Sequence, residues 1–252
     1  MNDTAMENPE SGNVREIGCC RQEIPPGTVE PVTFLRVLLV DSHAMVTDAL
    51  AVQLSTAADL WVVGSSSPDD PRLTELVHTL RPDVITTEVG PAPVATGGMV
   101  RKLSAAWSPA QLVILTGSHD TAHAVAAARA GAAAWVSKES SLDHLLEVLR
   151  GVPLGHAFYP PQQLGVVLRE LRADVQHARD CSARLDVLST REREVLLRMV
   201  DGTTVSQIAL ESVVSTSTVR THVRSILTKL GVRSRLEAVS VARAAGLRPA
   251  SD

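Results

Sequence analysis

One segment near the carboxyl end combines an apolar helical stripe with basic and hydroxyl side chains on its other face. The apolar positions recur at i, i+4, i+7 and i+11, as in a helix with one buried face: Val219, Val223, Ile226 and Leu230. The opposite face carries Arg220, Thr221 and Arg224, with Lys229 further along. Arginine can fork onto O6 and N7 of guanine, worth about 1–3 kcal/mol of base discrimination, or meet phosphates. The segment predicts a helix that contacts DNA; a solvated basic helix face is the alternative.

The other reactive side chains form no recognisable catalytic or metal-binding pattern. His119 and His123 lie at i and i+4, where they share one helix face, but no third ligand accompanies them. The three cysteines, two of which are adjacent, predict neither a disulfide framework nor a zinc site. No Ser-His-Asp arrangement, Walker loop or HExxH motif occurs, and the pair Gly97–Gly98 is interpreted as a loop. We therefore expect no metal, no cofactor and no enzymatic activity.

Charge is unevenly distributed along the chain. The 252 residues have a formal net charge of −4, which by itself argues against a nucleic-acid partner. From Arg184 onward, however, 11 basic residues accompany 7 acidic ones, so this stretch is net +4 and the remainder net −8. Such asymmetry indicates one basic module that faces a polyanion.

Composition and the amino-terminal segment restrict the location. No apolar run approaches the roughly 18–20 residues needed to span a bilayer. Residues 1–10 are acidic and polar, unlike a signal peptide. We expect a cytoplasmic protein with no membrane partner, associated with the nucleoid when bound to DNA. Residues 1–33, rich in Pro, Gly, Glu and Asn, predict a disordered tail.

The elements that would support these residues begin at Leu35. Short β-branched runs predict strands at Leu35–Val40, Leu60–Gly64, Asp83–Thr87, Gln111–Thr116 and Ala134–Ser137. Helical patterns alternate with them at Met45–Ser55, Pro71–Leu80, Met99–Trp107, His119–Ala130 and Leu142–Arg150. This alternation is typical of a parallel sheet covered on both faces, in which the functional crevice lies at the carboxyl ends of the strands.

A polar helix with a narrow apolar stripe follows a Gly/Pro break at Gly151–Pro161. The stripe has a 4-3-4-3 spacing from Gln162 to about Leu185: Leu164, Leu168, Leu171, Val175, Ala178, Ser182 and Leu185. Two interpretations remain open. The helix pairs with the same helix of a second chain, or it lies as a single amphipathic helix on the preceding domain.

Four short capped helices are predicted in the last 65 residues or so. Ser189 with Glu192, and Thr204 with Gln207, have the spacing of capping boxes. Ser215 and Ser234 begin two further helices, and glycines stand where helices would stop: Gly202, Gly231 and Gly246.

Residues 186–247 closely resemble the LuxR/NarL-type helix-turn-helix. The match includes the opening LSTREREVL at Leu188–Leu196, the recognition segment STVRTHVR at Ser217–Arg224 and the exit TKLGVRSRLEA at Thr228–Ala238. The resemblance implies that Arg220, Thr221 and Arg224 face the groove of double-stranded DNA, with contributions from Thr216, Ser217 and Lys229. It also implies a homodimer contact through the final helix, Arg235–Ala245. Ser212 departs from the family, which usually has an apolar residue there, and would loosen the second helix.

Residues 35–150, which precede this helix-turn-helix, resemble a response-regulator receiver. The resemblance implies a flavodoxin-like fold with five parallel strands in the order 2-1-3-4-5. The resemblance maps the receiver pocket onto Asp41, Ser42, Glu88, Thr116 and Lys138, and the switch aromatic onto Trp135. A working receiver holds Mg²⁺ with two acids and phosphorylates a third, an aspartate. Here the second acid is Ser42, and the acceptor position holds Glu88, whose carboxylate lies about 1.5 Å further out.

We therefore expect an atypical response regulator of the LuxR/NarL family, with four segments: a tail at 1–33, a degenerate receiver at 34–151, a linker at 152–185 and a helix-turn-helix domain at 186–252. Glu88 would pair with Lys138 and hold the receiver in one state, or the pocket would be inert and the domain a dimerisation scaffold. Three alternatives remain: a receiver crevice that senses a small molecule, a phospho-switch with another acceptor, and an enzyme or partner-binding protein with a vestigial helix-turn-helix.

Overall fold

A computed structural model describes residues 34–248, which fold as two units divided between Leu168 and Arg169. The tail expected at 1–33 and the last four residues lie outside the described part of the chain. The predicted segment boundaries remain predictions, because the division falls within one long helix rather than at either end of it.

The first unit is built on a five-stranded parallel sheet. Its strands have the order β2-β1-β3-β4-β5, which confirms the doubly wound fold class expected from the sequence. Each strand is paired in parallel with its neighbours, and β1 shifts register against β2 between Val37 and Leu38. The strands are β1 (Leu35–Val40), β2 (Leu60–Ser66), β3 (Val84–Thr87), β4 (Gln111–Thr116) and β5 (Ala134–Ser137).

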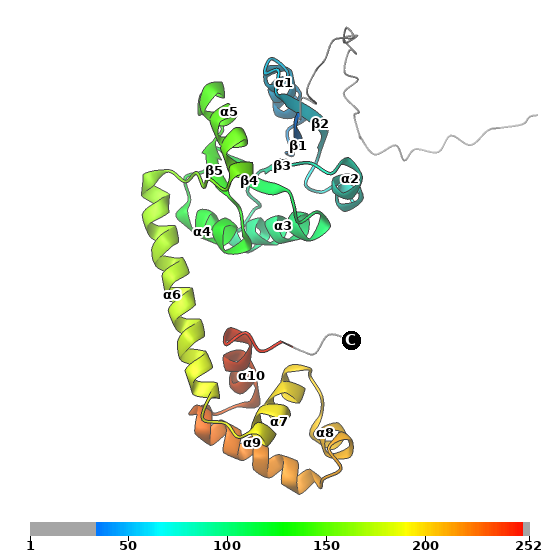
Figure 1. The fold of residues 1–252 in the computed structure, drawn as a ribbon, viewed down its shortest axis with the longest axis vertical. Coiled ribbons are helices and arrows are strands. Elements are labelled where there is room, and N and C mark those ends of the chain that lie inside the picture. Colours follow the sequence, from blue (N-terminus) through cyan, green and yellow to red (C-terminus); the bar gives the residue numbers. More distant parts are fainter. Residues whose placement is uncertain (1–33, 249–252) are drawn as a thin grey trace, which may run out of the picture. The chain divides into compact units, whose positions relative to one another are not determined.

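Helices cover both faces of this sheet (Figure 1). One face packs against α1 and α5, where Leu54 and Leu149 join the strand residues Val37 and Leu39 in one core. The other face carries α2, α3 and α4. The helices are α1 (Ala44–Leu54), α2 (Leu73–Leu80), α3 (Pro93–Ala106), α4 (Thr121–Ala130) and α5 (Leu142–Gly151), followed by the short 3₁₀ turn η1 (Val152–Leu154).

Helix α3 corrects one prediction. The sequence indicated a helix start at Met99 and a loop at Gly97–Gly98, but α3 begins at Pro93 and both glycines lie within it. Proline is tolerated in the first turn of a helix, where its missing N–H has no partner to lose. A Cβ on Gly97 would lie 3.1 Å from the Ala126 carbonyl oxygen of α4, so glycine here permits close packing of the two helices.

Helix α6 (Pro161–Leu185) begins in the first unit and ends in the second. Its buried residues include Gln163 and Val167 near the start and Cys181 and Leu185 near the end. The buried face of α6 differs from the apolar stripe expected from the 4-3 spacing. Of that stripe, Leu164, Leu168 and Val175 are exposed, whereas Leu185 enters the core of the second unit.

The second unit is a small helical module around one apolar core. Each of its helices has the serine or threonine N-cap that the sequence indicated, and Ser189 and Thr204 form complete capping boxes. The helices are α7 (Thr190–Val200), α8 (Val205–Glu211), α9 (Thr216–Leu230) and α10 (Arg235–Ala244). Among the described helices, none combines the length and the apolarity needed to cross a membrane.

Candidate nucleic-acid interface and receiver pocket

Helix α9 presents the predicted polar face to solvent. Ser215 caps its first turn by accepting a hydrogen bond from the Thr218 backbone N–H at 3.1 Å. Val219, Ile226 and Leu230 are buried as the spacing indicated, and Val223 is partly buried. The polar residues predicted to face DNA are all exposed: Thr216, Ser217, Arg220, Thr221, Arg224 and Lys229.

The two arginines of this face have no hydrogen-bond partners among the described residues, whereas the hydroxyl groups of Thr221 and Ser217 are hydrogen-bonded within the turn. The Thr221 hydroxyl donates to the Ser217 carbonyl oxygen at 3.0 Å, and the Ser217 hydroxyl lies 2.7 Å from that of Ser215. Within the described residues, the guanidinium groups of Arg220 and Arg224 have no hydrogen-bond or ion-pair partner. Both guanidinium groups are therefore free to meet an external acceptor.

Lys229 is engaged within the module. Its ammonium donates to the Glu192 carboxylate of α7 at 2.7 Å, and Glu192 also accepts from the Ser225 hydroxyl of α9 at 2.6 Å and from the Ser189 backbone N–H at 2.7 Å. The Lys229 and Ser225 hydrogen bonds hold the pKa of Glu192 at about 2, well below its ordinary value. Sequence reasoning identified Glu192 only as a capping residue; its second partnership was missed because Lys229 lies 37 positions away.

The turn before α9 contains a strained residue. Val213 has φ = +53°, a left-handed conformation that a β-branched side chain rarely adopts, and its side chain is 91% exposed. Ser212, where the resemblance implies an apolar residue, is partly exposed at the end of α8. The turn of this helix-turn-helix therefore carries backbone strain at Val213.

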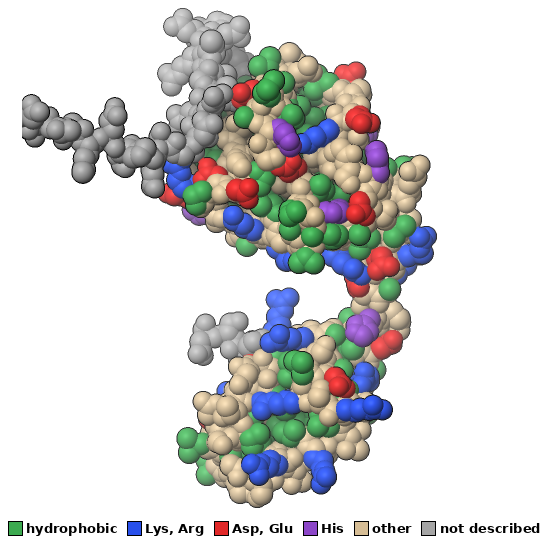
Figure 2. Space-filling model, turned by 180° about the vertical axis from the view of Figure 1, so that it is seen from behind, with side chains coloured by type: hydrophobic (Ala, Val, Ile, Leu, Met, Phe, Trp, Pro, Cys, Tyr) green, Lys and Arg blue, Asp and Glu red, His purple; other side chains and the backbone are tan. Residues whose placement is uncertain are grey.

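Basic side chains predominate over acidic ones on the face of the second unit seen in Figure 2. This agrees with the net charge of +4 from Arg184 onward. A surface of this sign attracts a polyanion at long range, while the unpaired arginines of α9 supply directional contacts.

The predicted receiver-pocket residues come from the carboxyl ends of β1, β3, β4 and β5, and the structure brings the three charged ones together. The Lys138 ammonium contacts the Asp41 carboxylate and lies 3.6 Å from Glu88 Oε2. Burial alone would raise the pKa of Asp41, but hydrogen bonds from Lys138 and His43 outweigh it and lower that pKa below its ordinary value. The expected pairing of Glu88 with Lys138 is present, shared with Asp41.

Two further contacts close this pocket. The Ser42 backbone N–H donates to Glu88 Oε1 at 2.7 Å, so the glutamate is held from both sides. His43 Nδ1 lies 3.0 Å from Asp41 Oδ1 and 3.7 Å from Glu88 Oε2. The sequence reasoning did not assign His43 a role; its position two residues after Asp41, at the end of a strand, was the available indication.

Thr116 joins this ion-pair cluster through its backbone, because the Lys138 N–H donates to the Thr116 carbonyl oxygen at 2.8 Å. Thr116 is buried, and its hydroxyl oxygen accepts from the Ser118 backbone N–H at 2.9 Å. Trp135 is buried too, and its backbone N–H donates to the Phe158 carbonyl oxygen at 2.7 Å. The expectation that His119 and His123 share one helix face was wrong, because α4 begins at Thr121 after its N-cap Asp120 and His119 precedes the helix. His123 Nδ1 lies 2.8 Å from the Thr96 hydroxyl.

The pocket fits poorly the Mg²⁺ ion that the resemblance implies. Asp41, His43 and Glu88 each offer one ligand atom, all within 4.8 Å of one another. However, the neutral Ser42 replaces an acid, and the cationic Lys138 lies against both carboxylates where a divalent cation would need them. The single Lys138 cation therefore already offsets part of the charge of the two carboxylates.

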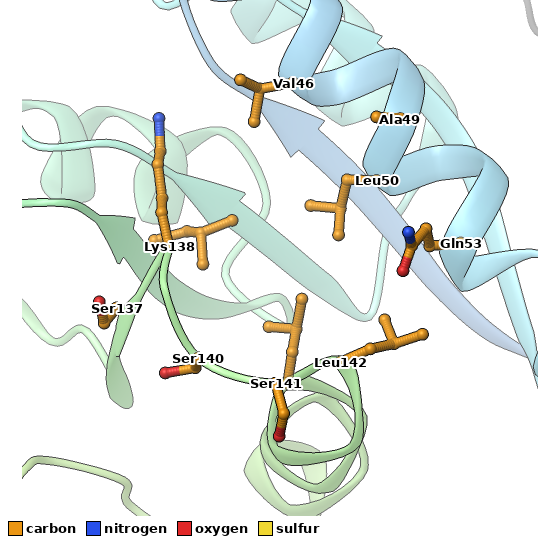
Figure 3. Close-up of a pocket in the computed structure, with 11 residues that line it drawn as sticks. Val46, Ala49, Leu50, Gln53, Ser137, Lys138, Ser140, Ser141 and Leu142 are labelled. Atoms are coloured by element: carbon orange, nitrogen blue, oxygen red, sulfur yellow. The ribbon is translucent and has the colours of Figure 1, made fainter.

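A cavity of about 220 Å³ adjoins the pocket between α1 and the segment after β5. Figure 3 shows the apolar side chains of α1, Val46 and Leu50, on one side and the Ser140–Leu142 turn on the other, with Lys138 extending along the rim. The lining is mostly apolar, with no carboxylate among its residues.

Comparison with known proteins places this architecture in a family. Residues 186–242 match the family model of bacterial regulatory proteins, luxR family. The chain is 31% identical over 209 residues to the probable transcriptional regulatory protein NarL of Mycobacterium tuberculosis, covering 82% of this chain and 93% of that protein. It is 29% identical over 204 residues to the transcriptional regulatory protein LiaR of Bacillus subtilis, covering 81% and 94%.

Among solved structures, the chain is similar to the response regulator ChrA of a heme-sensing two-component system, with 26% sequence identity and a TM-score of 0.43. The match covers 86% of this chain and 100% of the ChrA chain. The expected family is thus confirmed by the sequence relatives and by the match over the helix-turn-helix. This chain belongs to the NarL/LuxR family of response regulators, which are transcription regulators with a DNA-binding helix-turn-helix.

Proposed function

We propose that this protein regulates transcription by sequence-specific DNA binding without phosphorylation of an aspartate in its receiver. The observation that carries the proposal is the placement of the Lys138 ammonium against the carboxylates of Asp41 and Glu88. In a phosphorylated receiver, the negative charge of the phosphoryl group would attract Lys138. Here the carboxylate of Glu88, at the acceptor position, already supplies a negative charge to Lys138.

The chemistry of Glu88 supports the same view. Its carboxylate is one methylene longer than aspartate, and misplacement by about 1.5 Å is enough to lose most reactivity in a positioned reaction. Both its oxygens have partners, Ser42 N–H at 2.7 Å and Lys138 at 3.6 Å. The group is therefore held in place as a structural anion rather than presented as a nucleophile.

DNA recognition is assigned to α9. Arg220 and Arg224 are the donors for guanine edges, and Thr216, Ser217 and Thr221 complete the groove-facing surface. Lys229 is assigned a phosphate contact only through the part of its ammonium not held by Glu192. The protein is proposed to act as a homodimer in the cytoplasm, with half-sites about 34 Å apart along the DNA.

The test is selection of genomic DNA fragments by the purified full-length protein without any phosphodonor. We expect a motif with two half-sites from the wild-type protein and none from the double variant Arg220→Ala/Arg224→Ala. The matched control is Arg172→Ala/Arg179→Ala, which removes the same charge from exposed positions on α6. A motif that appears only after treatment with a phosphodonor would refute phosphorylation independence, and no motif at all would revive a vestigial helix-turn-helix.

A ligand-sensing crevice at the strand ends is less well supported. The cavity beside Asp41, Ser42 and Ser66 has a volume of about 140 Å³. Ligand pockets usually measure about 300–1,000 Å³. This cavity is therefore smaller than a typical ligand pocket.

A further inference from the structure

Helix α6 carries an apolar stripe that its own chain leaves uncovered. Leu164, Leu168 and Val175 of this stripe are 38%, 44% and 52% exposed. Around Val175 the helix is exposed on every side, because residues 172–177 all lie at the surface. A single amphipathic helix that lay on the preceding domain would bury its apolar stripe against that domain. The exposure of these side chains therefore favours the other interpretation of the 4-3 spacing, a pair of α6 helices from two chains.

The spacing also defines which residues would meet in such a pair. It places Leu168 and Val175 at a positions of a heptad repeat, and Leu164 and Leu171 at d positions. A β-branched residue at a with leucine at d, as in Val175 with Leu171, is the combination that favours two parallel helices. The stripe thus has the residue types of a two-stranded seam as well as its period.

Charged residues beside the stripe select the parallel orientation. Asp174 precedes Val175 at a g position, whereas Arg172 and Arg179 lie at e positions on the other flank. In a parallel pair the g flank of one helix faces the e flank of the other, so Asp174 would lie opposite Arg179 of the second chain. In an antiparallel pair the e flanks face each other and would oppose arginine to arginine. Exposed ion pairs contribute little affinity, so this pair determines the orientation rather than the strength of the contact.

The stripe is too short to hold two chains together alone. Stable coiled coils sustain their apolar repeat over at least about three to four heptads, and here Ala178 and Ser182 weaken the second half. The carboxyl end of α6 is fixed to the module that carries α10, because Leu185 packs in the same core as Ala242. A dimer contact through α10 would therefore hold two α6 helices at a high effective concentration.

We propose that the α6 helices of two chains pair in parallel and in register, with the stripe from Leu164 to Ser182 as their seam. The inference rests on the homodimer of the proposed function, and it adds a second contact to the one assigned to α10. Because α6 begins in the first unit and ends in the second, this contact extends the dimer from the DNA-binding module into the receiver unit.

The experiment measures disulfide formation between full-length chains that carry one introduced cysteine. The starting protein is Cys19→Ser/Cys20→Ser, and Leu168→Cys or Val175→Cys is added to it. Parallel helices in register would bring each of these cysteines beside its own copy, within the Cα separation of about 4.4–6.8 Å that a disulfide spans. Under mild oxidation we expect both variants to cross-link about tenfold faster than Ala173→Cys, whose exposed position lies on the opposite face of α6.

The two seam positions also report the orientation of the helices. They lie one heptad apart, about 10.5 Å along the helix axis. An antiparallel pair that aligned Val175 with its copy would therefore separate the two copies of Leu168 by about 21 Å. Cross-linking at only one of the two positions would overturn the parallel arrangement, and rates no faster than that of Ala173→Cys would overturn the pairing itself.

Controls separate this inference from the homodimer on which it rests. The starting protein without an introduced cysteine should not cross-link, because its remaining cysteine, Cys181, is buried. Sedimentation of each reduced variant gives the oligomeric state. A dimer whose seam cysteines do not cross-link contradicts the α6 pairing alone, whereas a monomer contradicts the homodimer of the proposed function as well. Thermal melts check that each variant is folded.

Discussion

The carboxylate of Glu192 in α7 accepts a hydrogen bond from the Lys229 ammonium in α9 at 2.7 Å, while it also receives the backbone N–H of Ser189. One side chain thus caps its own helix and fixes the register of the helix that carries Arg220 and Arg224. The residues proposed to face DNA depend on this pair for their position, although neither partner needs to touch a base.

Glu192→Gln should lower the free energy of unfolding of the helical module by about 1–3 kcal/mol, because one oxygen loses its charge and part of its hydrogen bonding. The measurement is urea unfolding of the full chain, followed at the Ile226 methyl resonance. Because the pKa of Glu192 is lowered from 4.5 to about 2 in the folded protein, its contribution is fully present above about pH 4.5. The gap between wild type and variant should close as the pH falls toward 2; a constant gap would contradict the ion pair.

Lys229 should behave differently from Arg224 on DNA. Its ammonium is shared with Glu192, so Lys229→Met should reduce stability and should lower the salt slope by less than the value of about 1 that a fully available phosphate contact contributes. Arg224→Ala should leave stability nearly unchanged, because the guanidinium has no partner among the described residues. Its loss should either relax base preference or reduce the salt slope by about 1, according to whether it meets a base or a phosphate. Fluorescence anisotropy across a salt series distinguishes these results.

Phosphorylation of the receiver should be restored only when both missing aspartates are introduced together. We expect neither wild type nor Glu88→Asp to be phosphorylated by phosphoramidate with Mg²⁺, because each still lacks the second acid at Ser42. The double variant Ser42→Asp/Glu88→Asp should be modified, since it recreates the acidic set and frees Lys138 from Glu88. Intact-protein mass spectrometry reports the outcome, and phosphorylation of the wild type would refute the proposed function.

Leu236 on α10 should belong to a dimer interface. Its side chain is 79% exposed on a helix whose buried residues, Ala238 and Ala242, face the core. Leu236→Asp should abolish cooperative binding to a two-half-site DNA and leave the fold intact. Leu154→Asp, at a 75% exposed position in the first unit, is the control. A dimer that survives Leu236→Asp in sedimentation would assign the contact to the exposed α6 stripe at Leu164, Leu168 and Val175.

Relief of the strained turn should stabilise the helical module. A left-handed backbone costs an ordinary residue about 1–2 kcal/mol, and asparagine tolerates it better than valine. Val213→Asn should therefore raise the free energy of unfolding by about 1 kcal/mol, measured by the same urea experiment. Val214→Asn, next to it but without a positive φ, should give no gain.

The regular elements were predictable because their periods and caps are local properties. Ser215 and Ser234 marked helix starts correctly, and strand bounds agree closely at Leu35–Val40 and Gln111–Thr116. The error at α3 arose because Gly97 and Gly98 usually break helices, whereas here Gly97 permits the approach of α4. The need for glycine at this position arises from the packing of α3 against α4, which the local sequence pattern does not contain.

The site was predictable in its residue types but not in its partnerships. The pattern placed Arg220 and Arg224 on one exposed face, and it anticipated Glu88 near Lys138. It did not indicate that Lys138 is shared with Asp41 or that Lys229 is held by Glu192. These relationships join residues from separate elements, so no spacing along the chain encodes them.

The internal neutralisation of Lys138 has a consequence for how such a regulator is controlled. Under the proposed function, a receiver with a permanent glutamate charge at its acceptor position has no phosphorylated state that a kinase and a phosphatase could interconvert. The protein's own synthesis and proteolysis are then the steps that would set the timing of promoter occupancy.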